Sequence, residues 1–186
     1  MRHTNLTTLE SFRKVVQTSG TPTKLAPYYV SGNIAFNDNG ASADTITDSG
    51  TRFLTEGFKA GDALVISGSS SNNKTVEIST VVAGTITLVS SAQLTTEAAG
   101  SSVTLLVLKG RKVEDGVGVV VKGLASNTGN ITLAETSAKA LNTNTDYDNH
   151  ITLAQNQSVA LQIKNLDQVW IDATVSGEGC EIIFEK

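Results

Sequence analysis

The stretch from Asp44 to Val89 constrains the fold most, because short runs of β-branched and aliphatic residues alternate there with clusters of turn-forming residues. Short apolar runs bounded by Gly, Ser, Asn and Asp are typical of antiparallel strands joined by tight turns. Two such runs are separated by the sequence GFKAGD at positions 57–62. The pattern therefore predicts an all-β protein.

The composition agrees with a folded all-β chain. The 186 residues are enough for one or two small domains, and only 17% of them are charged, with a net charge of −4. A disordered chain would carry more charge and fewer aliphatic residues. The mild acidity disfavours a nucleic-acid-binding protein, which needs a basic stripe to neutralise phosphates.

No apolar run is long enough to span a membrane, and the N-terminal sequence lacks the apolar segment of a secretory signal. The single cysteine, Cys180, rules out an internal disulfide. It precedes the run EIIF, so we expect a buried thiol rather than a reactive one.

Period-2 alternation and turn residues predict most of the strands. Residues 11–30 are expected to hold two short strands around a turn. Residues 1–10 are expected to form an extended or briefly helical arm, either a docking arm or a frayed tail. The remaining expected strands lie near 44–47, 63–67, 74–82, 85–89, 103–108, 117–124, 130–133, 151–153, 159–163, 168–175 and 180–185.

The GFKAGD segment suggests specific turn geometry. Gly57 and Gly61 would allow chain reversals on either side of Phe58, and the side chain of Asp62 would cap a turn. A second turn is expected at Gly84, where a hairpin would use a positive φ. The large apolar residues of the segment, which we expect to plug one end of a small barrel, are Phe53, Leu54 and Phe58.

Residues 57–88 resemble a small β-barrel module that recurs in virion proteins of tailed phages. In that module a GF-x-x-GD turn precedes a strand, a GS-x-x-N loop and a T-I-T-L strand, and all of these occur here. The resemblance implies a β-barrel, which removes exposed strand edges by closing. None of the matching residues carries a catalytic role in the module.

Other parts of the chain resemble a virion β-sandwich family. The matching segments are RKVVQTSGTPTKL at 13–25, VGVVVKGLASNTGNI at 117–131 and LQIKNLDQVWIDATVSGEGCEIIFE at 161–185. Because the first and second segments are far apart, the barrel module is expected to be inserted into the sandwich. The expected organisation is an arm at 1–10, a discontinuous sandwich of 11–33 and 111–186, and a barrel at 34–110. Two sequential domains are the alternative.

Few residues of the sequence are candidates for catalysis or metal binding. The only histidines are His3 and His150, so a Ser-His-Asp triad would have to use one of them, and no GxSxG motif occurs. The candidate metal ligands are Asn144, Asp146 and Asp148, whose side-chain oxygens alternate along one polar loop. The loop departs from the EF-hand pattern, and a solvated loop that joins two strands is the competing interpretation. We therefore expect no enzyme activity, no catalytic residues and no cofactor.

The resemblance implies a structural role. We expect a non-enzymatic phage virion protein that decorates or cements the capsid, is assembled in the host cytoplasm, and contacts the major capsid protein as a homo-oligomer, specifically a trimer. A tail, adaptor or fibre protein and a carbohydrate- or host-surface-binding module are the alternatives. No nucleic-acid or membrane partner is expected. The interface candidates are Leu6, Leu9, Phe12, Tyr28, Tyr29 and Trp170.

Overall fold

The computed structural model describes residues 9–91, 93–108, 118–141, 143 and 150–185. The chain divides into two compact units, which we call unit 1 (Met1–Ala26 and Lys109–Lys186) and unit 2 (Pro27–Leu108). Unit 2 thus lies within the sequence of unit 1. The division falls at 26/27, so residues 27–33, which we expected in the sandwich, belong to unit 2.

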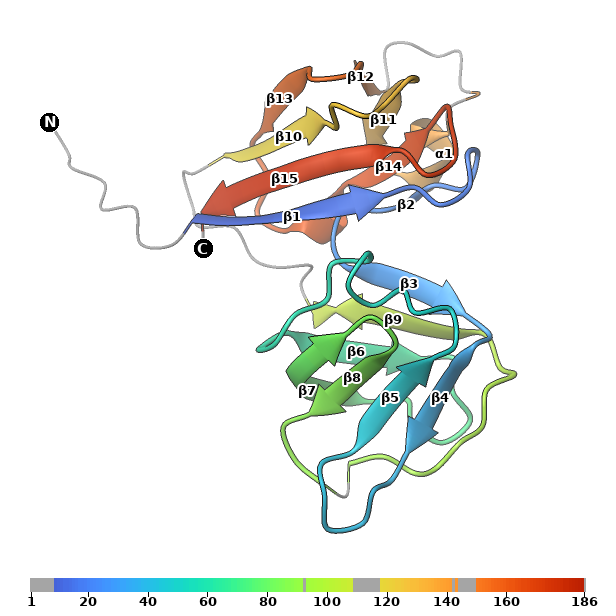
Figure 1. The fold of residues 1–186 in the computed structure, drawn as a ribbon. Coiled ribbons are helices and arrows are strands. Elements are labelled where there is room, and N and C mark those ends of the chain that lie inside the picture. The colour runs from blue at the N-terminus through green and yellow to red at the C-terminus, as the bar shows by residue number, and fades with distance from the viewer. Residues whose placement is uncertain (1–8, 92, 109–117, 142, 144–149, 186) are drawn as a thin grey trace, which may run out of the picture. The chain divides into compact units, whose positions relative to one another are not determined.

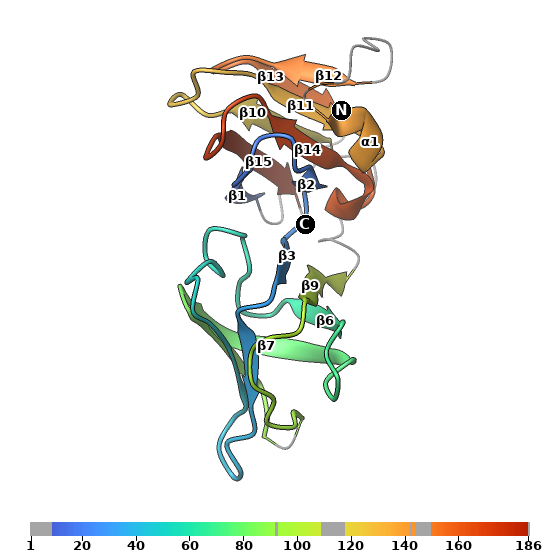
Figure 2. The ribbon, with the colours of Figure 1, turned by 90° about the vertical axis from the view of Figure 1, so that its right-hand side faces the viewer.

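Unit 1 consists of two four-stranded antiparallel sheets (Figure 1 and Figure 2). The first has the order β1-β15-β10-β13 and the second the order β12-β11-β14-β2. This sandwich-like arrangement agrees with the expected fold class. The strands are β1 (Leu9–Val15), β2 (Thr23–Lys24), β10 (Val119–Gly123), β11 (Ile131–Ala134), β12 (Ile151–Leu153), β13 (Ser158–Leu161), β14 (Trp170–Ala173) and β15 (Gly179–Glu185).

The core of unit 1 contains the inward-facing residues of these strands. On β10 the buried and exposed residues alternate strictly, and Val119 and Val121 are fully buried. The Cys180 side chain is also fully buried, and burial raises the pKa of its thiol to about 12. The expectation of a buried thiol is confirmed, and this pKa leaves the sulfur protonated at neutral pH.

Unit 2 is built on one seven-stranded antiparallel sheet of order β3-β9-β6-β7-β8-β5-β4. A single cluster of apolar residues from these strands forms its core. The strands are β3 (Tyr28–Ser31), β4 (Ile34–Asn37), β5 (Thr45–Asp48), β6 (Ala63–Ser67), β7 (Thr75–Val82), β8 (Thr85–Leu88) and β9 (Val103–Val107).

The prediction of a closed barrel for unit 2 is wrong. Closure would need a ladder between the terminal strands β3 and β4, but β3 pairs only with β9 and β4 only with β5 among the named strands. The pairing of β7 with β8 shifts register between Ile78 and Thr80, as at a β-bulge. A bulge of this kind bends a strand and increases its twist, so an open sheet can curve around a core.

Helical structure is minor among the described residues. The α-helix α1 spans Ser137–Ala140, with Thr136 as its N-cap, and the 3₁₀-helix η3 spans Leu166–Gln168. The brief helix considered near the N-terminus is not seen at residues 9–15, which form β1. Residues 1–8 lie outside the described part. None of the described helices has the length and apolar character needed to span a membrane.

The turn geometry expected for the GFKAGD segment is largely confirmed. Gly57 and Gly61 have φ of 87° and 81°, Phe58 is 2% exposed, and the Lys59 N–H donates to Oδ2 of Asp62 at 2.9 Å. Leu54 is the exception, because it is 54% exposed and plugs nothing.

The hairpin at Gly84 also differs from its prediction, since Gly84 is not among the positive-φ residues. A Cβ there would lie 3.2 Å from the Asp48 carbonyl oxygen, so close approach explains this glycine better than a left-handed turn.

Candidate functional site

The residues of the GS-x-x-N loop at 68–72 bind a carboxylate from a distant part of unit 2. Glu97 accepts hydrogen bonds from the Ser69 hydroxyl at 2.6 Å, the Ser70 N–H at 3.0 Å and the Asn72 side-chain amide at 3.0 Å. The Asn72 amide oxygen in turn accepts from the Thr95 N–H at 2.8 Å. The loop motif therefore fixes the 69–72 loop to the 95–97 segment.

These donors, led by the Ser69 hydroxyl, lower the pKa of Glu97 to about 2. Because the folded-state pKa lies below the ordinary carboxyl value of 4.5, this group stabilises the fold fully above about pH 4.5. That contribution is lost as the pH falls toward 2.

We expect Glu97→Gln to lower the melting temperature at pH 7 and to lose less stability than the wild type between pH 5 and pH 2. Thermal melts across about pH 2–7 test this, and equal pH profiles would contradict it.

A second polar cluster joins the NTG and GEG motifs of unit 1. The Asn127 side-chain amide donates to the Gly179 carbonyl at 2.8 Å, while its oxygen accepts from the Gly179 N–H at 3.2 Å. The Glu178 carboxylate accepts from the Thr128 hydroxyl at 2.8 Å and from the Gly129 N–H at 3.1 Å. Hydrogen bonds thus connect the NTG and GEG motifs, which lie about fifty residues apart in the sequence.

The residues that carry the resemblance to virion proteins therefore bind other parts of this chain. Each of the polar groups described above is engaged in a turn or a loop-to-loop contact. Within the described residues, no three His, Cys, Asp or Glu side chains gather closely enough to hold a metal ion. The metal candidates Asn144, Asp146 and Asp148 lie outside the described residues.

The aromatic interface candidates have different environments. Tyr29 is only 6% exposed and donates through its hydroxyl to Oδ1 of Asp48 at 3.2 Å, so it is a core residue and not a surface contact. Phe12 is half-buried and packs edge-on against Phe184 at a centroid separation of 6.2 Å. Tyr28 is half-buried, and burial raises the pKa of its hydroxyl.

The remaining interface candidates are Trp170, Leu9 and Leu6. Trp170 is half-buried on β14, and the Lys24 ammonium lies 4.4 Å from the centroid of its ring. The same ammonium donates to the Asp167 carbonyl at 2.7 Å, so one face of the indole is covered by a fixed cation. Leu9 begins β1, and Leu6 precedes the described residues.

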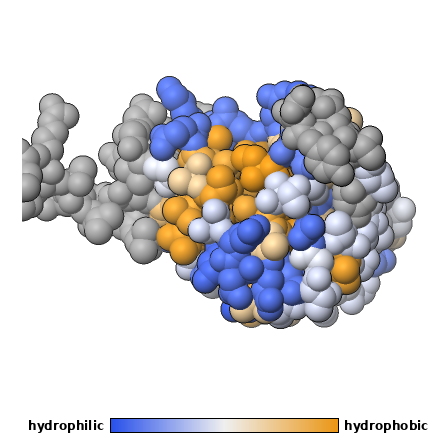
Figure 3. Space-filling view, turned by 90° about the horizontal axis from the view of Figure 1, so that it is seen from above, coloured by the Kyte–Doolittle hydropathy of each residue, from blue (hydrophilic) through white to orange (hydrophobic). Residues whose placement is uncertain are grey.

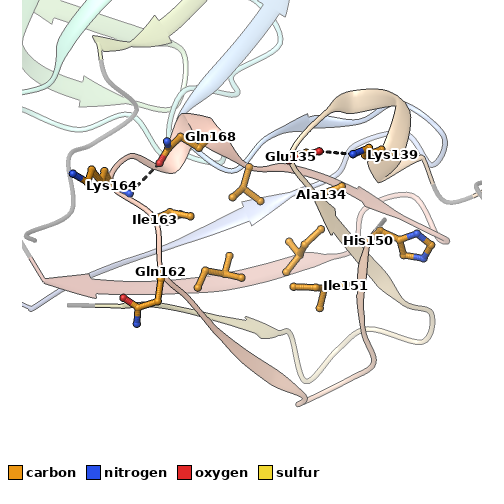
Figure 4. Close-up of a pocket in the computed structure, with 12 residues that line it drawn as sticks. Ala134, Glu135, Lys139, His150, Ile151, Gln162, Ile163, Lys164 and Gln168 are labelled. Atoms are coloured by element: carbon orange, nitrogen blue, oxygen red, sulfur yellow. Dashed lines mark hydrogen bonds and ion pairs between the residues drawn. The ribbon is translucent and has the colours of Figure 1, made fainter. Parts of the chain in front are cut away.

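The candidate binding site is a groove in unit 1 that the sequence did not predict. Its volume is about 830 Å³, and it is lined by residues from β11, β12, β13 and the segment that follows β13 (Figure 4). Its base is formed by the buried side chains of Leu133, Ala134 and Val169. Ile151, Leu161 and Ile163 form more exposed walls.

A polar rim surrounds this apolar interior. Figure 3 shows an apolar surface framed by hydrophilic residues. Lys139 and Glu135 form an ion pair on one side, and Lys164 lies on the other. The rim residues are Glu135, Lys139, His150, Gln162, Lys164 and Gln168.

The segment on the Lys164 side is held by a side-chain amide. The Gln168 amide oxygen accepts from the backbone N–H groups of Lys164 at 2.9 Å and Asn165 at 3.1 Å. This turn directs the chain from the end of β13 into η3 and keeps the groove wall in place.

No protein-family model, no curated protein and no solved structure gives a match.

Proposed function

We propose that this chain is a non-enzymatic structural protein of a tailed-phage virion that decorates or cements the capsid. The observation that carries the proposal is that the residues of the virion-like motifs bind other parts of their own unit. The GF-x-x-GD, GS-x-x-N, NTG and GEG residues all serve turns and loop-to-loop contacts within their units. Residues used in this way build a rigid surface, as a protein that must pack in many copies requires.

The proposed partner is the major capsid protein, and the chain would act as a homo-oligomer, with a trimer as the specific proposal. Phe12, half-buried on the terminal strand β1, and the preceding arm residue Leu6 supply apolar contacts in this proposal. The basic residues Arg2 and Arg13 suit an acidic shell surface, whereas the chain as a whole carries a net charge of −4. A tail, adaptor or fibre location is the alternative within the same class.

A carbohydrate- or host-surface-binding module is the second candidate function. It is favoured by the partial exposure of Trp170, the only tryptophan of the chain. The Lys24 ammonium over the ring would leave a sugar only the opposite indole face. Loss of glycan binding in Trp170→Ala, with the fold retained, would support this function over the capsid role.

Locating the protein in purified particles tests the proposal. We expect electron microscopy of particles carrying a tagged copy of the chain to place it on the shell, with copy numbers in the hundreds. A copy number of about six or twelve would place it in the tail instead. Absence from purified particles would overturn the proposal in both forms.

A further inference from the structure

The first sheet of unit 1, of order β1-β15-β10-β13, turns one face away from the core and presents exposed side chains there. The helix α1 contacts β11 and β14, which both belong to the second sheet. On the first sheet the outward side chains of β10 and β13 are exposed, and those of β15 at 181 and 183 are half-buried. The residues that define this outer face are Arg13, Val120, Lys122, Ala160, Glu181 and Ile183.

The two central strands of this sheet, β15 and β10, break the alternation expected of a face in water. An antiparallel sheet with one solvated face alternates inward apolar residues with outward polar ones. Here the apolar run VVV occupies 119–121 on β10, and the run IIF occupies 182–184 on β15. Continuous apolar runs are typical of strands that are covered on both faces. The outward residues Val120 and Ile183 therefore favour a covered outer face.

The outward residues of the central strands lie in two rows that cross the sheet. Val120 and Ile183 are direct cross-strand partners, so they form the centre of an apolar row. Two residues further along the strands, Glu181 pairs with Arg13 on one side and with Lys122 on the other. The second row therefore alternates positive, negative and positive charge.

A second copy fits both rows under a two-fold axis that runs parallel to the strands between β15 and β10. This axis places β10 of one copy over β15 of the other and keeps every residue in its row. Val120 of each copy then faces Ile183 of the other, and Lys122 of each copy faces Glu181 of the other. Both contacts occur twice, as in any isologous interface. Packed sheets lie about 10 Å apart, a separation that a lysine and a glutamate side chain span together.

We infer that two copies of this chain associate through the outer face of the first sheet, with Val120 against Ile183 and Lys122 paired with Glu181 across the two-fold axis. The occupant is a second copy because the face complements itself in apolar character and in charge. A partner of uniform charge would meet like charge in the second row.

The size of the face sets the expected affinity. The sheet has four strands, which lie about 4.8 Å apart, and β10 has five residues, so the face measures roughly 20 Å by 17 Å. Two copies that pack there bury an area at the low end for specific interfaces. We therefore expect a dissociation constant between about 1 and 100 μM.

The inference does not rest on the proposed function. A three-fold ring joins two different surfaces of neighbouring copies, whereas this contact joins one surface to itself. The two contacts are compatible, and copies that form both would associate as pairs of trimers. The expected observation in either case is a mass that doubles as the concentration rises.

Sedimentation equilibrium of the full chain from about 1 to 500 μM tests the inference. We expect the mass to double, and Val120→Glu, at a 37% exposed residue, to raise the dissociation constant at least about tenfold. Val82→Glu, at a 59% exposed residue of β7 in unit 2, is the matched control and should leave the constant unchanged. No doubling up to about 500 μM, or equal constants for Val120→Glu and the wild type, would overturn the inference.

Charge reversal tests the two-fold arrangement itself. Lys122→Glu brings like negative charges together across the axis, and Glu181→Lys brings like positive charges together, so each variant alone should associate at least about tenfold more weakly than the wild type. An equimolar mixture of the two should associate, because each reversed residue then faces an opposite charge. Glu77→Lys, which makes the same charge change at an exposed residue of β7, should not associate with Lys122→Glu. A mixture that stays as weak as its components would overturn the inference.

The remaining outcomes are distinguishable. Circular dichroism of each variant reports whether it folds, and if Val120→Glu does not, the charge-reversed mixture decides the question. A trimer that does not pair, or that Val120→Glu dissociates into single chains, would overturn the inference and keep the oligomer of the proposed function. Absence of the chain from purified particles would remove the proposed function and leave this test intact.

Discussion

Phe58→Ala is expected to lower the free energy of unfolding of unit 2 by about 3–5 kcal/mol. Phe58 is 2% exposed and packs edge-on against Phe53 at 6.1 Å, and Phe53 packs edge-on against Tyr29 at 6.2 Å. Truncation would leave a cavity beside the fully buried Phe53. The backbone around it cannot collapse freely, because the Phe58 N–H donates to the Phe53 carbonyl at 3.2 Å.

Leu54→Ala is the matched control in the same turn. Leu54 is 54% exposed, so the same kind of truncation should change stability by no more than about 0.5 kcal/mol. Denaturant unfolding followed by circular dichroism, with Trp170 fluorescence as a separate reporter of unit 1, assigns each effect to its unit. Equal costs for the two variants would mean that the Phe58 ring is not part of the core.

The sequence predicts strands well where side chains alternate with period 2 and turns are marked by small polar residues. β13 and β14 follow directly from the alternation at 159–163 and 168–175. β4 was not predicted, because Ile34, Ala35 and Phe36 are a short apolar run without a polar alternation. Local patterns of this kind report which residues face a core and not which strands pair.

Pairing explains why the barrel prediction was wrong and the groove was missed. A closed barrel requires β3 and β4 to pair, and in the structure they do not. Local residue patterns do not indicate which strands pair, so they could not predict this. The groove likewise depends on which strands end the two sheets. Leu161 and Ile163 have the same pattern as any core-facing pair, and only the topology leaves them beside an open edge. The NTG and GEG motifs were recognised singly, and the structure joins them.

The junction of these motifs gives the second large expected effect, which is at Gly179. A Cβ at this position would lie 2.0 Å from the Lys14 carbonyl oxygen and 2.9 Å from the Val15 Cα. Both obstacles are backbone atoms of β1, which pairs with β15 in the register Val15↔Gly179. Neither can move without breaking that pairing or the two hydrogen bonds between Gly179 and Asn127.

Gly179→Ala is therefore expected to destabilise unit 1 by at least about 3 kcal/mol, the upper end of the usual cost of overpacking. Gly177→Ala is the control in the same hairpin. It has a φ of 84° but open space where a Cβ would be, so its cost should be only about 1–2 kcal/mol of backbone strain.

Unfolding of both variants can be followed by the fluorescence of Trp170, which lies in unit 1. A larger loss in Gly177→Ala would show that left-handed backbone strain, and not the close approach of β1, sets the requirement for glycine in this hairpin.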